Sequence, residues 1–171
     1  DIGIAFDGDG DRAVFADETG EEIPADLLTA LFCEVILDRK LLGAGANAAM
    51  LYDLRSSRVV PETLRARGAV AIRSRVGHAF MKAVMRERGA CFGGELSGHY
   101  YFNFPSGYIG DDGAAAMMLL LEAIGARGLP LSKLWRPYRR YRQSGEINRR
   151  VADVPATLAR VRAAHAAGEA D

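Results

Sequence analysis

The sequence has no excess of charge of either sign and no long apolar segment. Among its 171 residues, Lys plus Arg and Asp plus Glu number 22 each. Balanced charge argues against non-specific binding to nucleic acid or to a membrane surface, which basic proteins favour. No apolar run in these residues approaches the roughly 20 that cross a bilayer, and no secretory signal or lipidation motif occurs in them. We therefore expect neither nucleic acid nor a membrane as a partner.

Cysteine is also scarce, and each of the two cysteines lies within an apolar stretch. Cys33 and Cys91 are expected to be reduced thiols in the core of a cytoplasmic protein, because disulfides are rare in that compartment. The hydrophobic content of 49% is sufficient for a buried core. The sequence opens on Asp1, directly before an apolar strand pattern, so we expect it to be a piece of a longer chain.

Strand and helix patterns alternate along the chain and predict an α/β fold. Residues 2–6 and 13–16 are short and apolar, and they flank a loop rich in Asp and Gly, which is typical of a β-hairpin. Apolar residues recur at helical spacing after Pro24. Two strand–helix units follow, "AAMLYDLRSSRVVPETLRARGA" and "AVAIRSRVGHAFMKAVMRERGA".

The remaining segments complete this prediction. "CFGGELSGHYYFNF" is predicted to be a strand with a glycine kink, and "DDGAAAMMLLLEAIGARG" a helix capped by Asp111 or Asp112. Residues 132–141 are predicted to form a further helix. From about Pro137 the composition becomes basic and polar, which indicates a linker. We expect a three-layer α/β domain with a mixed sheet between helices, preceded by a β-hairpin from a truncated neighbouring domain.

The stretch "FDGDGDRAVF" carries carboxylates on alternate positions, Asp7, Asp9 and Asp11. In an extended or tightly turned backbone these side chains converge on one side, and oxygen ligands suit a hard cation such as Mg²⁺. A calcium loop of the helix–loop–helix kind is excluded, because its sixth position requires glycine and here is Arg12. An arginine beside a cation binds an anion such as phosphate. The alternatives are a solvated acidic turn and a plain salt bridge.

A second polar motif, "GGELSGH", places Glu95, Ser97 and His99 on alternate positions. A carboxylate, a hydroxyl and an imidazole together can grip vicinal hydroxyls of a sugar, and the adjoining glycines permit close approach of a ligand. A polar strand end is the alternative reading. His78 and four arginines follow the two upstream strands, at the edge where ligands bind in α/β sheets. These arginines are Arg55, Arg58, Arg73 and Arg75.

Together these motifs resemble those of the α-D-phosphohexomutases, the phosphomannomutase/phosphoglucomutase family. "DIGIAFDGDGDR" resembles the family's metal-binding loop and "GGELSGH" its sugar-binding loop, and "DLRSSRVVPE", "RSRVGH" and "YRRYRQSGEIN" follow in the family's order. The resemblance implies an isomerase that interconverts hexose 1-phosphate and hexose 6-phosphate, of mannose or glucose. It also implies a phosphoserine donor, a 1,6-bisphosphate intermediate, Mg²⁺ as cofactor, and four domains around a cleft.

The resemblance also assigns roles to individual residues. Arg55 stands where some members carry a lysine implicated in acid–base or phosphate contact, although arginine rarely gives up its proton. The implied Mg²⁺ ligands are Asp7, Asp9 and Asp11. The implied catalytic residues are Arg12, Arg55 and His78, and the implied substrate-binding residues are Arg75, Glu95, Ser97 and His99.

By the same resemblance, residues 1–20 end the second domain, 21–136 form the third, and 137–171 are a linker and the start of the fourth. The sequence has no serine loop like Thr-Ala-Ser-His, so the isolated chain is expected to lack mutase activity. Its partners would be hexose phosphates and the remaining domains. Two rival functions stay open. One is a non-catalytic module that binds Mg²⁺ and sugar phosphates, and the other is a phosphatase with Asp7 as nucleophile, which requires a buried parallel strand before Asp7.

Overall fold

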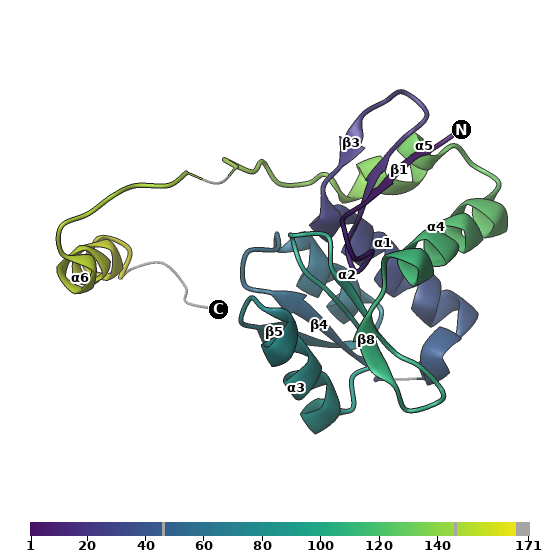
Figure 1. Cartoon of the computed structure of the whole chain (residues 1–171), viewed down its shortest axis with the longest axis horizontal. Coiled ribbons are helices and arrows are strands. Elements are labelled where there is room, and N and C mark those ends of the chain that lie inside the picture. The colour runs from purple at the N-terminus through teal and green to yellow at the C-terminus, as the bar shows by residue number, and fades with distance from the viewer. Residues whose placement is uncertain (46, 146, 167–171) are drawn as a thin grey trace.

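The computed structural model describes residues 1–45, 47–145 and 147–166, which form two sheets and the helices around them (Figure 1). The small sheet is antiparallel, in the order β1-β2-β3, with β1 (Gly3–Phe6), β2 (Ala13–Ala16) and β3 (Glu22–Ile23). The large sheet is mixed, in the order β5-β4-β6-β7-β8. Its strands are β4 (Ala49–Asp53), β5 (Val70–Ser74), β6 (Phe92–Gly94), β7 (Tyr100–Asn103) and β8 (Ile109–Asp111).

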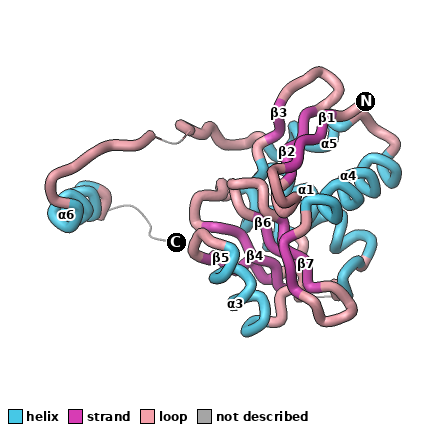
Figure 2. Tube along the Cα trace, in the orientation of Figure 1, coloured by secondary structure: helices cyan, strands magenta, loops and turns pink. Residues whose placement is uncertain are grey.

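Helices cover both faces of the large sheet (Figure 2). The helices of the described residues are α1 (Ala25–Arg39), α2 (Val59–Ala66), α3 (His78–Arg88), α4 (Gly113–Arg127), α5 (Leu131–Trp135) and α6 (Val154–Ala164), with short 3₁₀ turns η1 (Leu41–Gly43) and η2 (Arg136–Tyr138). Within the described residues no single helix is long and apolar enough to cross a membrane. Only α4 joined with α5 and η2 meets the length and composition criteria, as a pair bent by 91°.

The strand order explains why the helices lie on opposite faces. β4 runs parallel to both β5 and β6, so the chain steps outward from β4 to β5 and then back past β4 to β6. Because crossovers between parallel strands are right-handed, reversing the direction of the step moves the connecting helix to the other face. α2 therefore joins the core with α1 and α4, and α3 covers the far side.

Successive side chains of the central strand pack alternately into the two cores on opposite faces of the sheet. In β4, Met50 and Tyr52 pack toward α1, whereas Leu51 packs toward Met81 and Met85 of α3. Successive side chains of a strand point to opposite faces, so a strand buried on both sides reads as a continuous apolar run. The predicted three-layer α/β domain is confirmed.

The predicted hairpin is also confirmed. β1 and β2 pair antiparallel from Gly3 opposite Ala16 to Phe6 opposite Ala13, and the acidic residues occupy the loop between them. Only one side of this hairpin is buried, through Ala13 and Phe15 of β2. β3 pairs with β2 in turn, which extends the small sheet to Ile23.

Two predicted elements differ from the structure. The segment 91–104 is not one kinked strand but two antiparallel strands, with Gly94 of β6 opposite Tyr100 of β7, because the left-handed backbone of Gly98 (φ 89°) reverses the chain. The helix predicted at 132–141 ends early: α5 stops at Trp135 and η2 at Tyr138. Pro137 is the cause, since it has no N–H to continue the helical hydrogen bonds, even though Arg136 before it keeps helical dihedral angles (φ −56°, ψ −32°).

The last helix lies apart from the rest of the described chain (Figure 1). α6 buries none of its residues, and Asp153 caps its first turn by accepting a hydrogen bond from the amide of Ala156 at 2.9 Å. The two cysteines, Cys33 and Cys91, are buried and unpaired, as expected.

Candidate functional site: an acidic loop joined to a polar turn

The candidate site lies where three strands of the large sheet end together. β4, β5 and β6 are parallel, so their carboxyl ends share one edge. The Leu54 amide donates to the Ser74 carbonyl at 3.0 Å, which ties the β4 and β5 exits to each other. The Gly77 amide donates to Glu95 Oε1 at 2.6 Å and ties the exit of β5 to that of β6. The topology therefore brings the regions of Arg55, His78 and Glu95 to one edge.

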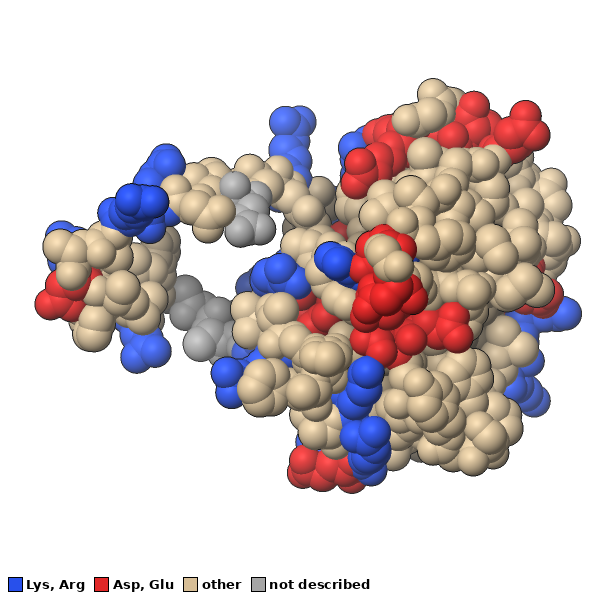
Figure 3. Space-filling model, in the orientation of Figure 1, with Lys and Arg blue, Asp and Glu red and all other residues tan. Residues whose placement is uncertain are grey.

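The acidic loop concentrates negative charge on the surface (Figure 3). One carboxylate oxygen from each of Asp7, Asp9 and Asp11 lies within 4.8 Å of the others. Arg12 binds back onto this loop: its amide donates to Asp7 Oδ1 at 3.2 Å and its Nε to Asp7 Oδ2 at 2.6 Å. Partial desolvation raises the pKa of Asp7, but the two Arg12 donors outweigh it and hold that pKa below its ordinary value.

This donor set fits Mg²⁺, the cation implied by the sequence. Carboxylate oxygens are the ligands of a hard divalent cation, and octahedral coordination at about 2.1 Å keeps ligand oxygens within about 4.2 Å of one another. A spread of up to 4.8 Å therefore requires only a small side-chain movement. Asp9 is exposed, which leaves one side of the loop accessible to further ligands.

The acidic loop and the "GGELSGH" turn are joined through their backbones. Arg12 and His99 form an isolated antiparallel bridge, and the Ala13 amide donates to the Gly98 carbonyl at 3.1 Å. Gly98 permits this approach, since a Cβ there would lie 3.1 Å from the carbonyl oxygen of Ala13. Beside the junction is a pocket of about 400 Å³, whose walls include Val14, Leu96 and Ser97.

Glu95 holds the turn together from inside. It is 1% exposed, and besides Gly77 it accepts a hydrogen bond from the Tyr101 hydroxyl, which reaches Oε2 at 2.9 Å. Burial raises the pKa of Glu95, but hydrogen bonds from His99, Gly77 and Tyr101 outweigh it and lower the pKa to about 2. Tyr101 was not predicted as a site residue, because its apolar strand context gave no signal.

Ser97 and His99 lie next to the Glu95 carboxylate, and both are half-buried. Ser97 Oγ lies 3.0 Å from His99 Nδ1, and each of these atoms lies 3.4 Å from Glu95 Oε2. Glu95 raises the pKa of His99, and the charge of Asp11 adds to this effect. The three predicted residues do converge, but through a tight turn rather than through alternation along a strand.

A buried carboxylate that sequence reasoning missed supports the neighbouring turn. Asp53 ends β4 with its side chain fully buried, and Oδ2 accepts from Arg55 Nε at 2.9 Å. Its other oxygen accepts from the Ser56 amide and hydroxyl at 2.9 and 2.7 Å. The position directly after an apolar strand was the available signal. Asp53 thereby positions Arg55 at the shared edge.

The other predicted residues are spread along the same edge. His78 opens α3 and is exposed, and Arg75 lies over the ring of Phe80 at 4.1 Å. Arg58 is the N-cap of α2. Arg73 was expected after a strand, but it lies within β5, because that strand continues to Ser74.

The surroundings of Asp7 argue against a phosphatase nucleophile. Such an aspartate was expected to follow a buried parallel strand, whereas Asp7 follows β1, which is antiparallel to β2. None of the four β1 residues is fully buried.

Comparison with known proteins identifies the family of this chain. Residues 24–141 match the family model "Phosphoglucomutase/phosphomannomutase, alpha/beta/alpha domain III". A phosphomannomutase of Methanocaldococcus jannaschii is 43% identical over 153 residues, which are 90% of this chain and 32% of that protein. A phosphomannomutase of Salmonella montevideo is 37% identical over 171 residues, 99% of this chain and 36% of that protein. The chain thus spans about a third of the length of these curated relatives.

Solved structures show the same fold. A phosphoglucomutase/phosphomannomutase family protein of Burkholderia thailandensis superposes with a TM-score of 0.69 at 31% identity, over 84% of this chain and 29% of that one. N-acetylphosphoglucosamine mutase of Aspergillus fumigatus, solved with GlcNAc-6P and magnesium, shares the fold with a TM-score of 0.61 at 18% identity, over 78% of this chain and 32% of that one. This chain belongs to the phosphoglucomutase/phosphomannomutase family.

Proposed function

We propose that this chain carries the cation-binding loop and the sugar-binding turn of a phosphohexomutase that interconverts the 1- and 6-phosphates of mannose or glucose. The observation that carries the proposal is the backbone junction between the two motifs, in which the Ala13 amide donates to the Gly98 carbonyl at 3.1 Å. A phosphoryl group transferred to or from a sugar hydroxyl requires the cation site and the sugar site to be adjacent, since such transfer depends mainly on positioning and charge stabilisation.

In the acidic loop, Asp7, Asp9 and Asp11 would hold Mg²⁺. Bound there, the cation would supply Lewis acidity and offset phosphate charge. Arg12 would bind the phosphate: its Nε is directed to Asp7, and its side chain is 48% exposed, so its remaining N–H groups are accessible to an anion. Arg55, held by Asp53, would contribute a second positive charge at the same edge.

In the polar turn, Ser97 and His99 would bind the hydroxyls of the sugar. Their polar atoms lie 3.4 Å from Glu95 Oε2, which is buried and also accepts from the Tyr101 hydroxyl at 2.9 Å, so Glu95 would hold both side chains in position and share its remaining acceptor capacity with the sugar. Arg75 and His78 are exposed beside the turn and would contact the substrate from α3 and the loop before it.

The domain organisation is part of the proposal. Residues 1–20 would end the second domain, 21–136 form the third, and 137–171 provide a linker and the start of the fourth. The pairing of β3 with β2 supports a first boundary slightly later, after Ile23. The remaining domains would then supply the phosphoserine, which the present sequence does not contain in a recognisable loop.

Calorimetric titration of the chain with Mg²⁺ and then with glucose 1,6-bisphosphate tests the two sites. We expect the chain to bind both ligands. Asp9→Asn should lower the affinity for Mg²⁺ by about 10–100-fold. Ser97→Ala should lower the affinity for the bisphosphate and leave the affinity for Mg²⁺ unchanged. Failure of the wild-type chain to bind either ligand would overturn the proposal.

Turnover of mannose 1-phosphate to mannose 6-phosphate by the isolated chain tests the assignment of the donor. We expect none, because the phosphoserine lies outside this sequence. Robust turnover would show that the chain has its own nucleophile. Trapping by beryllium fluoride at Asp7 would instead support the phosphatase alternative.

A further inference from the structure

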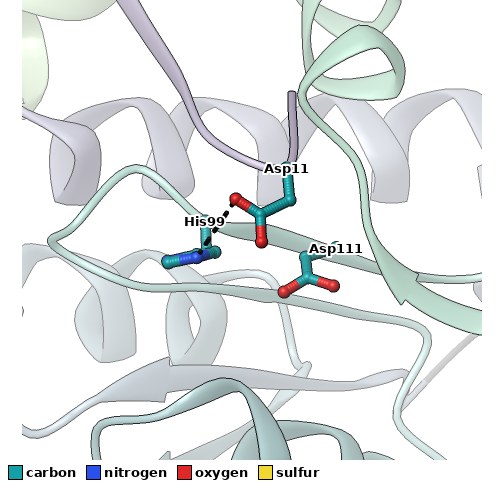
Figure 4. Close-up of side chains that lie close together, drawn as sticks. All are labelled: Asp11, His99 and Asp111. Atoms are coloured by element: carbon teal, nitrogen blue, oxygen red, sulfur yellow. Dashed lines mark ion pairs between the residues drawn. The ribbon is translucent and has the colours of Figure 1, made fainter. Parts of the chain in front are cut away.

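A second cluster of metal-binding groups lies beneath the acidic loop (Figure 4). It consists of Asp11, His99 and Asp111, which offer one ligand atom each within 4.8 Å of one another. His99 Nε2 lies 3.5 Å from Asp11 Oδ1. Unlike the set of Asp7, Asp9 and Asp11, this cluster combines an imidazole nitrogen with carboxylate oxygens.

Asp111 provides an independent sign that a ligand belongs there. Its side chain is only 7% exposed, and its Oδ1 pairs with Lys82 Nζ at 2.6 Å. Its Oδ2 is buried and accepts no hydrogen bond from any described residue. A buried carboxylate oxygen without a partner is unfavourable and rare in folded proteins, because desolvation is not compensated. Figure 4 shows one oxygen of the Asp111 carboxylate on the side of Asp11 and His99, and the three residues offer one ligand atom each within 4.8 Å of one another.

The three residues come from three segments that are held in place by their backbones. The loop before β2 is tied to the polar turn through Ala13 and Gly98. The Gly113 amide donates to the Gly10 carbonyl at 3.1 Å, and the Asp112 amide to the Tyr100 carbonyl at 3.1 Å. The side chains therefore do not need a large rearrangement to share a ligand.

We propose that Asp11, His99 and Asp111 form a second divalent-cation site, which takes a borderline transition-metal ion such as Zn²⁺ or Co²⁺ rather than Mg²⁺. Imidazole with two carboxylates is a donor set that suits these ions, and three protein ligands leave an open coordination position. Mg²⁺ prefers oxygen ligands alone. The site goes beyond the proposed mutase function and does not depend on it, although Asp11 belongs to both clusters and His99 is also assigned to the sugar-binding turn.

The test separates the two clusters by removing Asp9, which belongs only to the all-oxygen set. The Asp9→Asn chain is titrated with Co²⁺ while its proton NMR spectrum is recorded. We expect retained binding, with hyperfine-shifted ring protons from one histidine. Adding His99→Gln should abolish those signals and lower the affinity for Co²⁺ by about 10–100-fold. Adding Asp111→Asn should lower that affinity by a similar factor. His165→Gln, a change in an exposed histidine, is the matched control and should have no effect.

Two results would overturn the site. One is loss of Co²⁺ binding in Asp9→Asn alone, which would place the ion in the all-oxygen set. The other is unchanged affinity after Asp111→Asn, which keeps the shape and the Lys82 contact surface of the side chain. Thermal unfolding of each metal-free variant shows whether it is folded, and the shifted imidazole signals of the Asp9→Asn chain identify a histidine ligand directly.

Discussion

Gly94 in β6 faces α1 so closely that a side chain has no space. A Cβ on Gly94 would lie 2.1 Å from Thr29 Oγ1, 2.7 Å from its Cγ2 and 2.9 Å from its Cβ. Thr29 is fully buried and cannot turn into solvent. We expect Gly94→Ala to lower the free energy of unfolding by about 1–3 kcal/mol, since overpacking separates α1 from the sheet. Urea denaturation measures the change.

Gly93 is the matched control for this prediction. A Cβ on Gly93 would meet Leu51 Cβ at 3.2 Å and Met81 Cε at 3.3 Å, and the latter is the end of a flexible chain. Gly93→Ala should therefore destabilise less. Combining Gly94→Ala with Thr29→Ala removes the two nearest atoms and should restore part of the loss. Strictly additive effects of the two changes would contradict the proposed clash.

Asp17 makes the stability of the protein sensitive to acid. The Thr19 hydroxyl donates to Oδ1 at 2.6 Å and the Trp135 indole to Oδ2 at 3.0 Å. These bonds, led by that from Thr19 and opposed by burial, lower the pKa of Asp17 from 3.8 to about 2. The folded state therefore prefers the carboxylate, and this contribution is complete above about pH 4 and is lost as the pH falls toward 2.

We therefore expect the unfolding temperature to fall between pH 4 and pH 2, and to fall less steeply in Asp17→Asn. Circular dichroism at a series of pH values measures both slopes. Equal slopes in the two proteins would mean that other carboxylates, such as Glu95, account for the acid sensitivity.

At the scale of elements, α5 connects the small sheet to the domain through Trp135 and through Ser132, whose amide and hydroxyl donate to Glu18. Trp135 is fully buried and donates its indole N–H to Asp17, 118 positions away in the sequence. We expect Trp135→Ala to cost about 3–5 kcal/mol of unfolding free energy, because it leaves a large cavity and removes a buried hydrogen bond to Asp17. Trp135→Phe should cost less, since the ring volume is mostly kept. Arg139→Ala, a change in an exposed ion pair with Glu21, should alter stability by less than about 1 kcal/mol.

The sequence predicted those elements whose signals are local. The apolar spacing from Leu27 to Ile36 was sufficient to predict α1, and a cap at Asp111 or Asp112 was sufficient to predict α4, which is capped by Asp112, because each signal lies within or next to the helix that it defines. The division of residues 91–104 into two strands was missed, since the reversal depends on how β7 pairs back onto β6. The early end of α5 could have been predicted from Pro137, which has no N–H to donate to the helical hydrogen bonds.

The sequence predicted which residues make up the candidate site, but not the backbone contacts that join its two motifs. The motifs named the acidic residues and the polar turn, whereas the bridge between Arg12 and His99 joins residues 87 positions apart and has no local signature. Asp111 was read only as a possible helix cap. Its buried, unpartnered oxygen is a property of tertiary packing, which no spacing rule reveals.

At the scale of the whole molecule, the segment after Trp135 divides into a part that is packed and a part that is not. Tyr138 is 7% exposed and donates to Glu34 Oε2 at 2.6 Å, and Gln143 Nε2 donates to the buried Asp26 at 2.6 Å. Arg139 pairs with Glu21 at 2.7 Å. Beyond these contacts, α6 buries none of its residues. Stability should therefore depend on residues 136–143 and not on the helix that follows.

Two truncations test this division. A chain that ends at Gln143 should unfold within about 2 °C of the whole chain, because tolerance to truncation follows from burial. A chain that ends at Trp135 loses the buried ring of Tyr138, worth about 1.5–3 kcal/mol, and leaves the Asp26 carboxylate without its Gln143 partner. If both losses together amount to about 3 kcal/mol, then at about 2–4 °C per kcal/mol the unfolding temperature should fall by about 6–12 °C. Calorimetry measures each midpoint.

Equal midpoints for the two shortened chains would show that residues 136–143 only lie along the surface. A large fall in the unfolding temperature of the chain ending at Gln143 would show that α6 makes a stabilising contact in solution.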